Sequence, residues 1–208
     1  MEARDPVIHT VTNTEELQTK INRASNGDVI SLIKGVYNID KSIVINKTLT
    51  IQSEPDAKAQ LIFSGASNTP LFSLQPKGKL TINNIVLKGN ISNYAFASLK
   101  QNMSNHFGLT VSNSEISNFN YVLKAYKESF AERITFENTT ISNCENGIEL
   151  SEEKNDKMIK IEIEFFTYWV LLTSFRSEES KCHWFNNWID FVINVLFIKL
   201  FLNFSFLC

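Results

Sequence analysis

The sequence has no excess of positive charge, little cysteine and no apolar run at its start. Its 20 Lys and Arg residues face 22 Asp and Glu residues, so the formal net charge is −2. We expect no nucleic-acid partner, because nothing in this balance attracts a phosphate backbone. The three cysteines are too widely spaced for a redox motif or a metal knuckle. The opening residues lack the apolar core of a secretory signal, so we predict no signal peptide and leave the localisation open.

Glycine and proline disappear towards the C-terminus. The last glycine is Gly147 and the last proline is Pro76. We therefore divide the chain into an N-terminal segment with a capping helix (1–28), a repetitive part (29–157) and an atypical apolar tail (158–208).

The tail is rich in Phe, Ile, Leu, Asn and Lys. AT-rich DNA that is read out of frame or past a gene break gives this composition, and we interpret the tail in that way. The alternative is a C-terminal membrane anchor, because residues 188–208 are long enough to span a bilayer. Asp190 and Lys199 weaken this alternative, since charged side chains near the centre of a membrane helix are costly.

A short amphipathic helix is predicted close to the N-terminus. Asn13 and Glu16 have the spacing of a capping box, and Leu17, Ile21 and Ala24 fall on one helical face.

A segment of the form apolar-Thr-apolar-x-Asn then recurs. Its copies begin at Leu80, Leu109 and Ile134, so the starts are separated by 29 and 25 residues. Each copy places an asparagine where the chain would turn a corner, a position that tolerates left-handed backbone angles. These asparagines, which we expect to form a hydrogen-bonded ladder, are Asn84, Asn113 and Asn138.

The period predicts an all-β fold, a right-handed single-stranded parallel β-helix whose first coil the N-terminal helix covers. Each coil is too thin to bury an apolar face alone and must stack on its neighbours. In this alignment Phe136 matches Ile82 and Val111, so we expect it in the core. Cys144 occupies the position of Phe119 one coil earlier and is expected to pack there too.

The best candidate site is the charged stretch 124–133. Lys124, Lys127 and Arg133, with Tyr126 between them, could bind the carboxylate of an acidic sugar and stack on its ring. The alternative is an ordinary solvated connection between coils.

The other candidate residues give weaker support for a functional site. Glu152, Glu153 and Asp156 could suggest glycoside hydrolysis, but they lie in a charged run typical of a surface loop. His106 is expected in a loop between coils. We predict no catalytic, cofactor-binding or metal-binding residue in this chain, because no phosphate loop, nucleophile elbow or zinc-binding helix is present.

Two runs of the sequence stand out together. The first is Glu16-Leu-Gln-Thr-Lys-Ile-Asn-Arg-Ala24 followed by Gly27-Asp-Val-Ile-Ser-Leu-Ile-Lys-Gly35-Val-Tyr37, and the second extends from residue 123 to residue 156. Both resemble polysaccharide lyase family 6, which includes alginate lyases and chondroitinase B and has the pectin lyase-like solenoid. The second run looks most like the C-terminal β-helix of two-domain members. Lys124 and Arg133 match that second domain and not the catalytic one.

The resemblance implies a function in β-elimination on uronic-acid polysaccharide. In that family the catalytic Lys and Arg and a calcium site belong to the N-terminal β-helix, so the resemblance assigns no catalytic residue here and places calcium in a domain this chain lacks. It also implies a periplasmic, secreted or outer-membrane-associated parent protein.

Two functions remain open. The chain is either the non-catalytic part of an alginate or chondroitin-type lyase, inactive alone, or a free-standing carbohydrate-binding or structural β-helix. The expected partners are an anionic polysaccharide and a catalytic β-helix domain, if one is encoded upstream. A membrane is a partner only if the tail is genuine.

Overall fold

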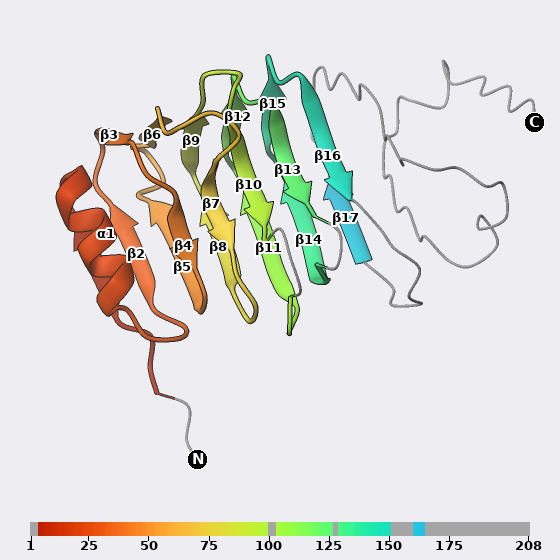
Figure 1. Cartoon of the computed structure of the whole chain (residues 1–208). Coiled ribbons are helices and arrows are strands. Elements are labelled where there is room, and N and C mark those ends of the chain that lie inside the picture. Colours follow the sequence, from red (N-terminus) through yellow and green to blue (C-terminus); the bar gives the residue numbers. More distant parts are fainter. Residues whose placement is uncertain (1–3, 100–102, 127–128, 151–159, 165–208) are drawn as a thin grey trace, which may run out of the picture.

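The chain forms a parallel β-helix with one short helix at its N-terminal end (Figure 1). The computed structural model describes residues 4–99, 103–126, 129–150 and 160–164. In each coil the chain passes through three sheets in turn, which we call A, B and C, and every strand pairs in parallel with the equivalent strands of the neighbouring coils. The predicted fold class is confirmed.

Sheet A consists of β1 (Ile8–Val11), β2 (Val29–Leu32), β5 (Thr48–Ser53), β8 (Lys79–Asn83), β11 (Phe107–Ser112), β14 (Ala131–Glu137) and β17 (Lys160–Glu164). Sheet B consists of β3 (Val36–Ile39), β6 (Ala59–Phe63), β9 (Ile85–Lys88), β12 (Glu115–Ser117) and β15 (Thr140–Ser142). Sheet C consists of β4 (Ile43–Ile45), β7 (Pro70–Leu74), β10 (Tyr94–Ser98), β13 (Tyr121–Ala125) and β16 (Asn146–Leu150).

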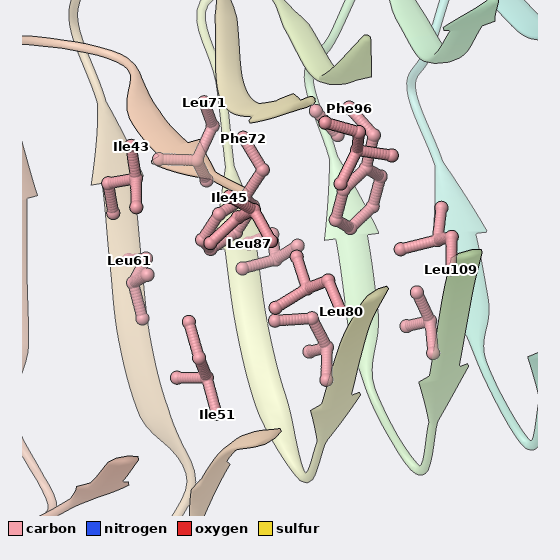
Figure 2. Packing of buried hydrophobic residues seen from close by; sticks show 14 of the residues in the cluster. Ile43, Ile45, Ile51, Leu61, Leu71, Phe72, Leu80, Leu87, Phe96 and Leu109 are labelled. Atoms are coloured by element: carbon pink, nitrogen blue, oxygen red, sulfur yellow. The ribbon is translucent and has the colours of Figure 1, made fainter. Parts of the chain in front are cut away.

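The repeated sequence segments are paired strands of sheet A. Leu109 pairs with Leu80 on one side and with Ile134 on the other, so the three copies stack as they were aligned. Phe136 pairs with Val111 and is 1% exposed, which confirms its place in the core. Apolar side chains from all three sheets fill the interior, and Figure 2 shows the middle coils.

The asparagine corners are confirmed, but the ladder is only partly formed. Asn84, Asn113 and Asn138 have φ angles of 58°, 52° and 46°. Asn138 Nδ2 donates to Asn113 Oδ1 over 3.3 Å, which is the expected contact. Asn113 instead donates to Asn83. The amide of Asn84 turns away because the loop of the preceding coil presents backbone carbonyls, including that of Pro55 at 3.2 Å.

The helix α1 (Thr14–Arg23) lies against β1, β2 and β3 at the N-terminal end of the solenoid (Figure 1). Leu17, Ile21 and Ala24 are buried, as predicted. Asn13 Oδ1 accepts from the Glu16 backbone N–H at 3.0 Å. The Glu16 carboxylate accepts from the backbone N–H of Thr12, one residue earlier than in a standard capping box.

Asp28 ties this N-terminal cap together. Its carboxylate, which is almost fully buried, accepts from the backbone N–H groups of Ser25 and Val7 at 2.8 and 3.0 Å and contacts His9 Nε2 at 3.0 Å. Arg4 also pairs with it. The His9 contact, followed by the Ser25 N–H, holds the pKa of Asp28 well below its usual value. Asp28 therefore links β1, the end of the helix and β2 as an anion.

One strand, β17, lies in the segment 158–208 that we assigned to the tail from the sequence. β17 pairs with β14 in register, Ile134 with Ile161 and Phe136 with Ile163, and so adds a seventh strand to sheet A. The remainder of residues 158–208, including the alternative membrane anchor, lies outside the described residues. Within the described part of the chain, no helix is both long and apolar enough to cross a membrane.

Candidate functional site

A lysine surrounded by three tyrosines lies on sheet C. Lys124, in β13, places its Nζ 4.3 Å from the centre of the Tyr121 ring, 5.6 Å from that of Tyr94 and 5.7 Å from that of Tyr126. Its partner on the neighbouring strand β10 is Ala97. Since Ala97 has only a methyl group, it leaves the longer lysine side chain room to lean over the aromatic rings, where the ammonium is attracted by their π faces.

Glu149 completes the group. It lies in β16, directly beside Lys124 in the register, and its Oε2 is 3.5 Å from the lysine Nζ. The side chains of Lys124 and Glu149 are 19% and 22% exposed, so solvent screens this pair less than an exposed one. We call Tyr94, Tyr121, Lys124, Tyr126 and Glu149 the Lys124 cluster.

The tyrosines hold one another in place. Tyr94 and Tyr121 meet edge to face, with ring centres 5.4 Å apart and planes at 80°. The Tyr94 hydroxyl donates to Asn68 Oδ1 at 3.0 Å. Burial, and then the neighbouring Tyr94 phenol, raise the pKa of Tyr126 to about 12. Tyr126 is therefore harder to deprotonate than an ordinary tyrosine.

A second asparagine row positions these tyrosines. Asn93 and Asn120 directly precede Tyr94 and Tyr121 in the chain. The Asn120 N–H donates to the Asn93 carbonyl at 2.7 Å, and the Asn146 N–H donates to the Asn120 carbonyl at the same distance. Asn146 Nδ2 also donates to Asn120 Oδ1 at 2.9 Å. These bonds fix where β10, β13 and β16 begin, and so they place Tyr94 and Tyr121 at the same position of neighbouring coils.

The sequence analysis missed Tyr94, Tyr121 and Glu149 as members of the site. The signal was present in the repeated Asn-Tyr dipeptides at 93–94 and 120–121, whose spacing of 27 residues equals one coil. Glu149 could have been found by extending the same register by one further coil.

The predicted site residues fall in different places. Lys124 and Tyr126 come together in the Lys124 cluster. Arg133 lies on β14 in sheet A, where its Nε donates to Thr135 Oγ1 at 3.3 Å. Lys127 lies outside the described residues, as do the acidic residues Glu152, Glu153 and Asp156.

Two further expectations concern side chains near the corners. His106 precedes β11 in a loop, with its ring edge-on to Phe130 at 6.1 Å between centres. Cys144 is half-buried and packs against the core, and burial raises the pKa of its thiol. The described residues contain no group of three or more His, Cys, Asp or Glu side chains that could hold a metal ion.

Chemically, the Lys124 cluster combines three kinds of group that could contact a polar ligand with an apolar face, such as a sugar. Aromatic rings offer flat apolar faces to the C–H surface of a sugar, while a lysine donates to carboxylate or hydroxyl oxygens and a glutamate accepts from hydroxyl groups. All three kinds of group meet here on neighbouring strands.

Comparison with solved structures finds the same kind of β-helix in a PL6 family alginate lyase. The chain is similar to the PL6 family alginate lyase AlyGC, with a TM-score of 0.63, 19% identity and 78% of this chain covered. It is also similar to a point mutant of that enzyme, with a TM-score of 0.67, 21% identity and 79% of this chain covered. The chain spans about a quarter of the length of these enzymes, covering 25% of each. The likeness shows a PL6-like β-helix fold.

A search of curated proteins found no match. The profile of the family described as "Domain of unknown function (DUF4957)" matches residues 35–170, which include every strand from β3 to β17. The match runs past Met158 and thus into the segment that the sequence set apart as a tail. Because it covers more than half of the sequence, this chain belongs to the DUF4957 family.

Proposed function

We propose that this chain is the non-catalytic β-helix part of a polysaccharide lyase and that it binds uronic-acid polysaccharide, of the alginate or chondroitin type, through the Lys124 cluster. The observation that carries the proposal is the position of the Lys124 ammonium over three tyrosine rings on sheet C. A uronate sugar presents a carboxylate for the ammonium and a C–H face for an aromatic ring.

Binding without catalysis suits these side chains. β-Elimination needs a positioned base together with neutralisation of the sugar carboxylate. In the Lys124 cluster, burial raises the pKa of Tyr126 to about 12, so its phenol is harder to deprotonate than an ordinary one, and the Lys124 ammonium is paired with Glu149. Catalysis would then belong to a second, N-terminal β-helix domain, together with any calcium. The lyases of similar fold are about four times longer than the segment matched here, which leaves room for such a domain.

The test is a titration of the purified chain with alginate and chondroitin-type oligosaccharides, in which binding is measured by calorimetry and by NMR. Wild-type protein should bind, and Lys124→Met and Tyr121→Ala should weaken binding about tenfold or more, since each removes a central contact. Lys88→Met, which removes the same charge from sheet B, is the matched control and should bind like wild type. Binding that Lys124→Met leaves unchanged would contradict the proposal.

The same samples test the absence of catalysis. No ultraviolet absorbance from unsaturated products should develop with either polymer. If it does, the chain is itself a lyase, and Lys124→Ala and Arg133→Ala are the first substitutions to assay. A free-standing carbohydrate-binding β-helix would give the same binding results, and the DNA upstream of the gene, read in all frames, distinguishes it from a lyase subunit.

A further inference from the structure

Within the Lys124 cluster, the Glu149 carboxylate already occupies the ammonium group that an acidic ligand would bind. We propose that Glu149 sets the charge selectivity of this site, by occupying the Lys124 ammonium that a uronate carboxylate would need and by keeping the site open to neutral sugars. This inference rests on the proposed function and names the residue that decides which sugars the site prefers.

The register makes the competition unavoidable. Lys124 and Glu149 are direct partners on β13 and β16, so their side chains leave the sheet next to each other. The preceding residues of the same row, Ala97 and Ser73, are small and uncharged. The formal charges of Lys124 and Glu149 cancel, so this row of sheet C offers no net positive charge to a polyanion.

The Lys124–Glu149 pair is also long for a charged hydrogen bond. The distance of 3.5 Å between Lys124 Nζ and Glu149 Oε2 exceeds the roughly 2.7–2.9 Å of a well-formed charge-assisted hydrogen bond. A ligand carboxylate that reaches the shorter distance can therefore displace Glu149. The displaced carboxylate stays close by, however, and repels the ligand at an effective dielectric well below that of water.

A neutral sugar meets no such opposition. It can donate a hydroxyl hydrogen to Glu149 and accept one from Lys124 while its ring lies on Tyr126, which leaves both charges partnered. The two side chains are each about one-fifth exposed, so a ligand can reach both. Wild-type protein should consequently discriminate little between acidic and neutral oligosaccharides.

The substitution that isolates this effect is Glu149→Gln, which keeps the shape of the side chain and removes its charge. Glu137→Gln is the matched control, because it changes the net charge equally on the exposed face of sheet A. Each protein is titrated with a uronate hexasaccharide and with a neutral hexasaccharide of the same linkage, at low and at high salt. Thermal midpoints verify that the variants remain folded.

We expect Glu149→Gln to bind the uronate about three- to tenfold more tightly than wild type and the neutral sugar no more tightly. The gain should shrink at high salt, while Glu137→Gln should behave like wild type. Measurable binding with an unchanged or weakened uronate affinity in Glu149→Gln overturns this inference alone. If neither sugar binds to wild type or to Glu149→Gln, both this inference and the proposed function are wrong.

Discussion

Replacement of Phe136 by alanine tests whether the stacked core extends to the later coils. The Phe136 side chain is 1% exposed and faces the interior next to Val111 of the preceding coil. A buried phenylalanine removes on the order of 150–250 Å² from water, which at about 25 cal/mol per Å² gives roughly 4–6 kcal/mol as an upper bound. Phe→Ala substitutions in protein cores cost about 3–5 kcal/mol, and we expect a loss in that range.

The assay is urea unfolding followed by circular dichroism, with the free energy taken from the midpoint and slope. Glu137→Ala is the control, because this neighbouring side chain is exposed and should change the free energy of unfolding by less than about 0.5 kcal/mol. If Phe136→Ala does not fold, Phe136→Leu should fold with a smaller loss. A loss below about 1 kcal/mol for Phe136→Ala would refute the reasoning, since the last coils would then not share the cooperative core.

Two substitutions and a pair of truncations have defined outcomes. Ile91 is a β-branched residue at φ 68°, so Ile91→Asn should raise the free energy of unfolding by about 1 kcal/mol; a loss of stability would mean that its side chain packs usefully. Asp28→Asn should lower the thermal midpoint at neutral pH. Because the pKa of Asp28 is lowered in the folded state, its contribution to the free energy of unfolding is complete above the unfolded-state pKa of about 3.9 and is lost as the pH falls below that pKa. If Asp28→Asn is still less stable than wild type by the same amount at the lowest pH, the stability does not come from the charge of Asp28. Chains that end at residue 156 or at residue 170 should both be more soluble than the full chain and at least as stable as it, with the longer one the more stable because it keeps β17. Unfolding of both would show that the tail is a genuine cap.

The repeat allowed the register of β8, β11 and β14 to be predicted from the sequence, because one alignment of the three copies fixes both strand pairs at once. Leu80, Leu109 and Ile134 stack as the alignment placed them. The asparagine ladder was less predictable. Whether an amide bonds to the next coil depends on competing carbonyls in loops of variable length, and at Asn84 such carbonyls take the amide.

The candidate site was predicted only in part, because the stretch 124–133 crosses a corner of the solenoid. Lys124 and Arg133 are nine positions apart in the chain, yet they belong to sheets C and A. Neighbours in a β-helix are instead separated by one coil, as Lys124 and Glu149 are. A search for chemistry within one continuous stretch therefore found two of the five residues of the Lys124 cluster and added Arg133 from another sheet.

The position of Glu149 connects the stability of the fold to the function we propose. Its strand, β16, carries Ile148 and Leu150, which pack against the core but are only half-buried, whereas Leu123 on β13 is fully buried. The lysine thus stands on a firmly packed strand and its competitor on a less firmly packed one. Movement of Glu149 away from Lys124 disturbs less buried surface than movement of the lysine would. Among the two charged partners, the glutamate is therefore the one that a ligand carboxylate can displace, while the tyrosines keep the lysine in place to receive it.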